Sequence, residues 1–156
     1  MPGQVLTVLL RVRHPAATPV AKSAAVRPKI LIVDDETDAR HLLDYNFSAA
    51  GFEVITASSG DAALRSAARY KPDVILLDIV LPDMDGFAVC RRLRTQPATA
   101  DTPVVVLSSH SGFSVQAAGA EAGVRRCLSK TTDLNKIIAA VRLSWEEARS
   151  CSRAQM

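Results

Sequence analysis

Five short apolar runs alternate with helix-patterned segments from residue 30 onward, and few folds accommodate this alternation. The runs cover residues 30–33, 54–57, 74–77, 104–107 and, more weakly, 126–128. They are continuously apolar, which is typical of parallel strands buried on both faces of a sheet. Because each strand is followed by a helical pattern, the sequence predicts an α/β fold, a doubly wound parallel sheet with helices on both faces.

The segments between the runs have the spacing of amphipathic helices. The first of them places Ala39, Leu42, Leu43, Phe47 and Ala50 on one helical face. Gly51 follows at the position where a helix ends, because glycine readily adopts a left-handed conformation. Further helices are expected at 61–70, 87–94, 113–122 and 133–149, the last with Asp133 as its N-cap.

The basic character of the chain comes from its first residues. Of the 19 basic residues, five lie within 1–29, where there is no acid, so 14 basic residues face 16 acidic ones in the remainder. We expect residues 1–28 to be a disordered basic tail or the product of a start codon assigned too far upstream, with an organellar transit peptide as an alternative. One domain then covers 29–143, and 144–156 extend the last helix and form a tail.

The remaining composition indicates a soluble protein of a reducing compartment, and we expect a cytoplasmic location without membrane contact. Cys90, Cys127 and Cys151 are widely spaced and lack the CxxC or histidine pattern of a zinc site. Their odd number also argues against a framework of disulfide bonds. No apolar run reaches the roughly 18 residues that a membrane-spanning helix needs.

Polar side chains that carry chemistry come directly after the strands. Asp34 and Asp35 follow the first strand, Asp78 the third, Ser108 the fourth and Lys130 the fifth. Each has an ordinary explanation alone: an acid pair can cap a helix, a lysine can be a solvated charge and a serine can be part of a turn. Ligands of open parallel sheets bind at the carboxyl ends of the strands, so we expect these residues to converge on one edge.

Three carboxylates, a hydroxyl and an ammonium indicate phosphoryl transfer assisted by a metal. Clustered carboxylates repel one another unless a cation or a proton intervenes. Hard oxygen ligands without histidine or thiolate favour Mg²⁺, with Mn²⁺ as a possible substitute, over zinc. A carboxylate such as Asp78 can act as the nucleophile and form an aspartyl phosphate.

Four stretches together resemble the receiver domain of two-component response regulators, a family that includes chemotaxis regulators. They are KILIVDDE (29–36), VILLDIVLPDMDG (74–86), VVVLS (104–108) and SK (129–130), within a similarity that covers about residues 28 to 143. The resemblance implies a flavodoxin-like sheet of strand order 2-1-3-4-5. It further implies a signalling domain instead of an enzyme, with at most self-phosphorylation from small donors and self-dephosphorylation.

The resemblance also implies roles for single residues. Asp78 matches the phosphoacceptor, Ser108 the switch hydroxyl and Lys130 the lysine that contacts the phosphoryl group. The implied metal ligands are Asp34, mainly through water, Asp35, Asp78 and the backbone carbonyl of Val80. Val80 and His110 occupy the two positions that tune the lifetime of the phosphoryl group in this family, and the apolar Val80 predicts slow to moderate autodephosphorylation.

Two positions depart from the family pattern. Cys127 stands where many receivers have an aromatic residue that reports phosphorylation, and Thr131 stands where a proline usually follows the lysine. We expect a stand-alone response regulator that takes its phosphoryl group from a sensor histidine kinase or a histidine phosphotransfer protein. Phosphorylation would then change its affinity for an unidentified protein target. The alternative left open by Cys127 and Thr131 is a receiver-like docking module that no longer switches.

Basic residues on the third predicted helix raise the question of nucleic-acid binding. Arg91, Arg92 and Arg94 form one cluster, and Arg125 and Arg126 form a second. Nucleic-acid sites usually interleave such cations with aromatic residues that stack on bases, and these are lacking beyond Phe87. We therefore expect solvated helix charges and no direct contact with nucleic acid.

Overall fold

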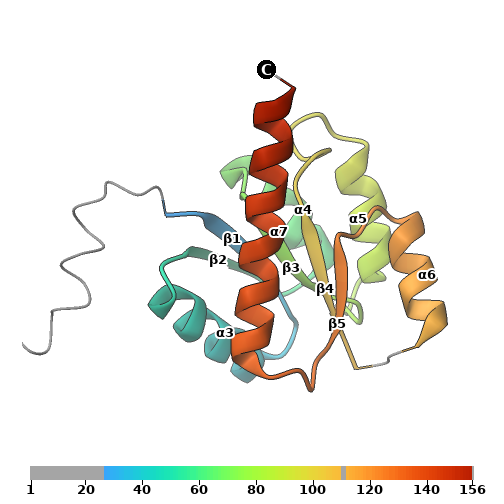
Figure 1. The fold of residues 1–156 in the computed structure, drawn as a ribbon. Coiled ribbons are helices and arrows are strands. Elements are labelled where there is room, and N and C mark those ends of the chain that lie inside the picture. The colour runs from blue at the N-terminus through green and yellow to red at the C-terminus, as the bar shows by residue number, and fades with distance from the viewer. Residues whose placement is uncertain (1–26, 110–111, 156) are drawn as a thin grey trace, which may run out of the picture.

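The computed structural model describes residues 27–109 and 112–155, in which strands and helices alternate strictly (Figure 1). The elements are β1 (Lys29–Val33), α3 (Thr37–Ala49), β2 (Glu53–Ala57), α4 (Gly60–Tyr70), β3 (Val74–Asp78), α5 (Gly86–Arg94), β4 (Val104–Ser108), α6 (Phe113–Glu121), β5 (Arg126–Ser129) and α7 (Leu134–Ala154). The expectations for residues 1–26 and for His110 lie outside the described residues.

The strands form one parallel sheet in the order β2-β1-β3-β4-β5. Strands β3 and β4 are buried along their whole length, which explains why their sequences are continuously apolar. The predicted fold class and strand order are confirmed. Since β1 and β3 are neighbours while β2 lies outside them, the strand order reverses beside β1, where ligands of such sheets bind.

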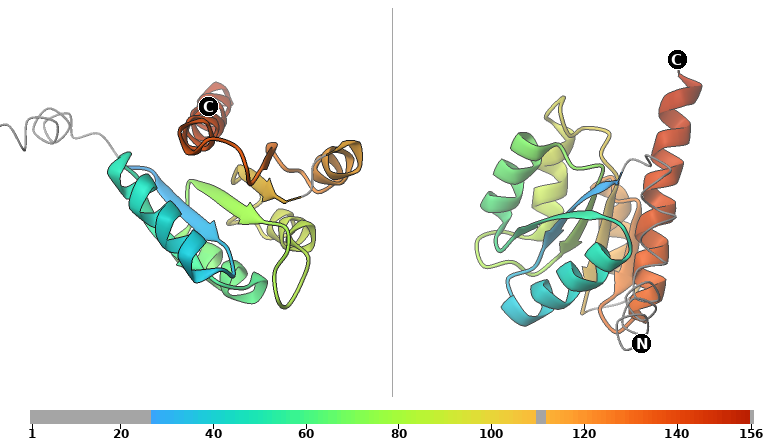
Figure 2. Two further views of the ribbon diagram at one scale, coloured as in Figure 1. Left: turned by 90° about the horizontal axis from the view of Figure 1, so that it is seen from below. Right: turned by 90° about the vertical axis from the view of Figure 1, so that its left-hand side faces the viewer.

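Helices cover both faces of the sheet, as expected. On one face, Leu43 and Phe47 of α3 and Ile137 of α7 pack with the inner side chains of β1, β3 and β4. On the other face, Ala63 of α4 and Val89 of α5 belong to the second hydrophobic cluster. The right-hand view of Figure 2 shows α7 on one side of the strands and α4 and α5 on the other.

Helix α3 buries a narrower face than its sequence pattern predicts. Leu43 and Phe47 are buried, four residues apart, but Leu42 is 58% exposed. The assignment of Leu42 to the buried face was wrong, because it lies about 100° around the helix from Leu43 and points away from the sheet. Gly51 has the positive φ of 98° expected beyond the end of this helix.

Helix α7 continues to Ala154, past the predicted end at residue 149. Asp133 caps its start as expected, accepting a hydrogen bond from the Asn135 amide at 2.8 Å. Farther along, Arg126 of β5 donates to the buried Ser144 hydroxyl at 2.6 Å and pairs with Glu147 at 2.8 Å. None of the helices in the described part of the chain is both long and apolar enough to cross a membrane.

Arg94 is not the solvated charge that the sequence suggested. Arg91 and Arg92 are exposed, but the half-buried Arg94 guanidinium donates to three carbonyl oxygens of the loop before β4 and to the Gly123 carbonyl before β5. Burial lowers the pKa of Arg94 from its usual value. The side chain therefore stabilises two loops by satisfying backbone acceptors, and the expectation of solvation was wrong for this residue. It was also wrong for Arg126, which lies on β5 and binds Ser144 and Glu147.

Candidate functional site

The register of the sheet brings the predicted site residues to one edge. Val33 pairs with Leu77, so the residues that follow them, Asp34 and Asp78, come abreast at the ends of β1 and β3. Asp78 in turn pairs with Leu107, the residue before Ser108. Ser108 pairs with Ser129 of β5, the residue before Lys130. The polar residues that follow or end these strands therefore lie together at the carboxyl ends of the strands.

Lys130 bridges two carboxylates at this edge. Its Nζ donates to Oδ2 of Asp78 at 2.8 Å and lies 3.4 Å from Oδ2 of Asp34. Burial alone would lower the pKa of Lys130, but the hydrogen bond and charge of Asp78, with the charge of Asp34, outweigh it and raise the pKa. The ammonium therefore stays protonated and offsets part of the negative charge of the acid cluster.

The three acids lie close enough together to hold one cation. Ligand oxygens of Asp34, Asp35 and Asp78 all lie within 4.8 Å of one another. Asp34 and Asp78 are buried, whereas Asp35 is exposed to solvent. This set of hard oxygen donors at the end of a sheet fits a small divalent cation such as Mg²⁺.

Backbone amides orient both buried carboxylates. Oδ1 of Asp34 accepts from the Glu36 amide at 2.9 Å, and Oδ1 of Asp78 accepts from the Val80 amide at 3.2 Å. Each carboxylate thereby keeps its Oδ2 on the side of Lys130. Arg40 adds a contact that the sequence did not reveal, donating to the backbone carbonyl of Asp34 at 2.8 Å.

The loop between β3 and α5 is tightly folded beside Asp78. The Gly86 amide donates to the Ile79 carbonyl at 2.7 Å, and Val80 pairs with Asp85 in an isolated antiparallel bridge. A Cβ atom on Gly86 would lie 2.6 Å from the backbone carbonyl oxygen of Asp78, so only glycine fits. The loop therefore places the backbone of Val80 next to the acid cluster.

Ser108 lies at the end of β4 and is buried, with 3% of its surface exposed. Its carbonyl accepts a hydrogen bond from the Lys130 amide at 2.8 Å, which ties the ends of β4 and β5 together. Ser108 therefore lies on the same rim as Asp78 and Lys130, at the end of the strand between β3 and β5.

Both departures from the receiver pattern lie on β5 and the loop after it. Cys127 is half-buried beneath α6, where a Cβ atom on Gly119 would lie 2.6 Å from its Sγ. Thr131 makes two contacts that a proline could not make. Its backbone amide donates to the Ser129 hydroxyl at 3.1 Å, and the Thr131 and Ser129 hydroxyls lie 2.7 Å apart. Side-chain hydrogen bonds therefore shape the turn after Lys130.

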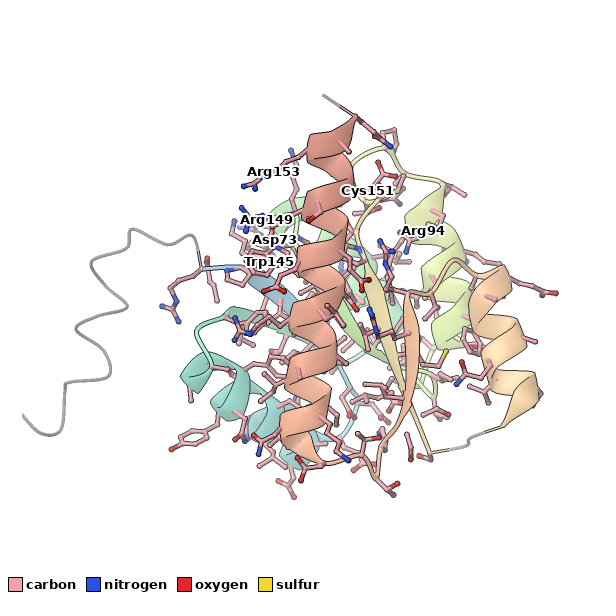
Figure 3. The ribbon with its side chains drawn as sticks, viewed as in Figure 1. Asp73, Arg94, Trp145, Arg149, Cys151 and Arg153 are labelled. Atoms are coloured by element: carbon pink, nitrogen blue, oxygen red, sulfur yellow. The ribbon has the colours of Figure 1, made fainter. Side chains whose placement is uncertain are left out.

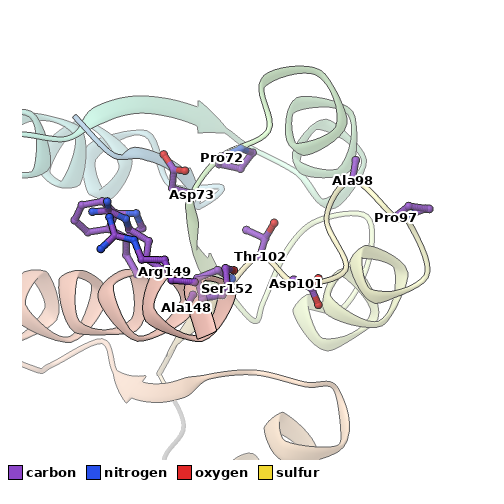
Figure 4. A pocket seen from close by; sticks show the side chains of 12 residues that line it. Pro72, Asp73, Pro97, Ala98, Asp101, Thr102, Ala148, Arg149 and Ser152 are labelled. Carbon is purple, nitrogen blue, oxygen red and sulfur yellow. The ribbon is translucent and has the colours of Figure 1, made fainter. Parts of the chain in front are cut away.

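A cleft lies at the amino-terminal ends of the strands, opposite the acid cluster, and none of the predicted site residues lines it. This cleft of about 440 Å³ is lined by the loops before β3 and β4 and by the last turns of α7. Asp73, Trp145, Arg149 and Arg153 lie there together, with the Arg149 guanidinium 4.8 Å from the centre of the Trp145 ring (Figure 3). Asp73 and Arg149 face the cleft from opposite sides (Figure 4).

The sequence comparisons agree on one family. The description "Response regulator receiver domain" matches residues 30–142. Response regulator PleD of Caulobacter vibrioides is 42% identical over 114 residues, which are 73% of this chain and 25% of that protein. The DNA-binding dual master transcriptional regulator RpaA of Synechocystis is 37% identical over 115 residues, 74% of this chain and 48% of that protein. The chain thus spans a quarter to a half of the length of these relatives.

Solved structures show the same architecture. The chemotaxis response regulator CheY4 of Vibrio cholerae superposes with a TM-score of 0.73 at 28% sequence identity. The superposition covers 76% of this chain and 99% of CheY4. The match therefore includes nearly all of CheY4 and about three quarters of this chain.

Proposed function

Because the chain belongs to the response regulator receiver family, we propose that Asp78 accepts a phosphoryl group from a phosphohistidine. Receiver domains are signalling domains that interact with histidine kinases or phosphotransfer proteins. The observation that carries the proposal is the convergence of Asp34, Asp35, Asp78 and Lys130 on one edge of the sheet. Ser108 lies on the same rim and completes the set.

The proposed step is a simple displacement at phosphorus. A carboxylate oxygen of Asp78 forms a new O–P bond while the N–P bond of the donor's phosphohistidine breaks. The imidazole leaves with the electron pair of that bond and takes up a proton. Lys130, already 2.8 Å from Oδ2 of Asp78, would stabilise the added negative charge, and Ser108 would donate a hydrogen bond to a phosphoryl oxygen.

The donor set fits Mg²⁺, held by Asp34, Asp35, Asp78 and the backbone carbonyl of Val80. When bound, the ion would neutralise charge on the phosphoryl oxygens. Asp34 and Asp78 are oriented for this task by the amides of Glu36 and Val80. Mn²⁺ prefers similar oxygen donors and can serve as its probe.

The signal would pass from Ser108 and Lys130 to the face made by α6, β5 and α7, as the family resemblance implies. A bulky aromatic side chain is absent at position 127, so we infer that Ser108 at the end of β4 carries more of the change than in receivers with an aromatic residue there. Phosphorylation would then alter affinity for a protein target. Independence from an attached output domain and the lack of contact with nucleic acid stay predictions.

The other candidate is a docking module that does not switch, which the half-buried Cys127 favours. Its small side chain cannot rotate between two well-separated positions as a large ring can. In this reading the acid cluster would persist, but phosphorylation would leave partner affinity unchanged.

Intact-mass spectrometry after incubation with Mg²⁺ and acetyl phosphate tests the proposal. We expect one hydroxylamine-labile phosphoryl adduct on the wild type and none on Asp78→Asn. Asp73→Asn is the matched control, because Asp73 also accepts a backbone amide hydrogen bond, from Lys29 at 2.8 Å, but lies at the opposite edge of the sheet. A folded wild type without an adduct, also with histidine-kinase donors, would contradict the proposal.

A further inference from the structure

One carboxylate ties the tip of the β3–α5 loop to the first turn of α4. Asp83 accepts from the Gly60 amide at 2.7 Å through Oδ1 and from the Asp61 amide at 2.8 Å through Oδ2. Helix α4 already has a local cap, since the Ser59 hydroxyl accepts from the Ala62 amide at 3.1 Å. Asp83 therefore satisfies the two amides that the local cap leaves without a partner, and it does so from a distant loop.

Charge and packing strengthen this contact. The hydrogen bonds from the Asp61 and Gly60 amides lower the pKa of Asp83, so its carboxylate stays ionised at the amino end of the helix, where negative charge is favoured. The next residue, Met84, packs so closely over Gly60 that a Cβ atom there would overlap its side chain. The loop and α4 are thus joined by two adjacent residues of the loop.

The same helix start connects to the acid cluster from its other side. The strand that leads into α4 ends at Ala57, whose carbonyl accepts from the Asp34 amide at 3.1 Å. The loop that carries Asp83 begins at Asp78, whose Oδ1 accepts from the Val80 amide. One backbone hydrogen bond thus ties Asp34 to the end of β2, and Asp83 ties the start of α4 to the loop that carries Val80, three residues before Asp83.

We propose that Asp83 is a positioning residue that fixes the Val80 backbone against the acid cluster and so sets the affinity of the site for a divalent cation. Val80 is 59% exposed, so burial does little to hold this part of the loop. Residues that orient metal ligands without touching the metal commonly change affinity by about 10- to 100-fold. The inference rests on the proposed function, because it assumes that the cluster and the Val80 carbonyl bind the ion.

Binding of Mn²⁺, followed by the electron paramagnetic resonance signal of the free ion, tests the proposal directly. We expect Asp83→Ala to raise the Kd for Mn²⁺ about tenfold or more. Asp83→Asn keeps one acceptor oxygen and should give an intermediate value. The matched control is Asp73→Ala, which also removes a carboxylate bound to a backbone amide but at the opposite edge, and its Kd should equal that of the wild type.

Thermal unfolding of each variant separates a local effect from loss of the fold. If Asp83→Ala does not fold, the Kd for Mn²⁺ of Asp83→Asn is compared with that of the wild type instead. A Kd within twofold of the wild-type value in a folded Asp83 variant would overturn this inference and leave the proposed function standing. A folded wild type that binds no Mn²⁺ would overturn both.

Discussion

Lys130 and Asp78 are joined by a hydrogen-bonded ion pair of 2.8 Å, although β4 lies between β3, which ends at Asp78, and β5, which ends one residue before Lys130. The same ammonium lies 3.4 Å from Asp34, so one cation serves two of the three clustered acids. A divalent ion that binds these acids must therefore compete with the Lys130 ammonium for their carboxylate oxygens.

Replacing Lys130 with glutamine should therefore separate metal binding from phosphorylation. Without the competing ammonium the carboxylates repel more strongly, so we expect Mn²⁺ to bind about 3- to 10-fold more tightly. Phosphorylation by acetyl phosphate should nevertheless become slower, because the developing charge loses a partner. Lys136→Gln, an exposed lysine on α7, is the control for both measurements. Weaker Mn²⁺ binding in Lys130→Gln would show that the lysine does not compete with the ion.

Val80→Asn should shorten the lifetime of the phosphoryl group. The exposed apolar side chain of Val80 stands at the rim beside Asp78, and a polar amide there can orient an attacking water molecule. We expect a faster decay of the adduct in time-resolved intact-mass measurements. Leu143→Asn, a similar change at an exposed leucine of α7, should decay like the wild type. Equal decay rates for Val80→Asn and the wild type would show that the Val80 side chain does not influence the lifetime of the phosphoryl group.

Two glycines at helix starts should differ in their tolerance of alanine. A Cβ atom on Gly86 would meet backbone atoms of Asp78 and Ile79 at 2.6 and 2.7 Å, and these cannot move without disturbing β3. On Gly60 it would meet chiefly the flexible Met84 side chain. We expect Gly86→Ala to lower the free energy of unfolding by about 3 kcal/mol and Gly60→Ala by less than about 1 kcal/mol, measured by urea denaturation. Equal losses would contradict the packing described for the β3–α5 loop.

Glu147 should make a pH-dependent contribution to stability. Its hydrogen bond and ion pair with Arg126 lower the pKa of Glu147 below the usual 4.5. A lowered carboxyl pKa adds stability that is present above pH 4.5 and is lost as the pH falls through the folded-state value. The stability difference between wild type and Glu147→Gln, from urea unfolding, should thus be constant from about pH 6 to 8 and shrink below pH 4.5. The exposed neighbour Glu146, changed to glutamine, serves as the control, and a difference that grows toward low pH would contradict the argument.

The three cysteines should react with iodoacetamide in a fixed order. Burial raises the pKa of Cys90 to about 12, and Cys127 is half-buried with a pKa that burial also raises, whereas Cys151 is exposed on α7. Because the thiolate is the reactive form, we expect alkylation of Cys151 first, Cys127 next and Cys90 only on unfolding. Peptide mapping at pH 8 measures the order, and early labelling of Cys90 would show that the β3–α5 side of the core opens readily.

The sequence was sufficient to predict the sheet and the residues at its carboxyl edge. Continuous apolar runs have few alternatives to parallel strands, and once the strands are parallel their last residues must meet. Asp34, Asp78 and Lys130 each follow such a run, so their proximity follows from chain order and from the parallel direction of the strands.

Features that depend on the relative placement of two loops could not be read in this way. Asp83 and Asp85 have similar surroundings in the sequence. Asp85 caps its own helix by accepting from the Phe87 amide, whereas Asp83 accepts from the Gly60 amide at the start of α4. Likewise Arg94 resembles Arg91 and Arg92 until its surrounding carbonyl oxygens are located. Such contacts depend on tertiary distances that no local periodicity contains.

The hydrogen bonds of Arg94 also bear on how the molecule fluctuates. If the loop before β4 opened alone, a half-buried guanidinium would lose three of its acceptors at once, and opening of the loop before β5 would remove the fourth. The two loops should therefore open as one cooperative unit, with similar protection of their amides against hydrogen exchange. The start of β4, which ends at Ser108, and the start of β5, which Lys130 follows, should therefore lose and regain their structure together.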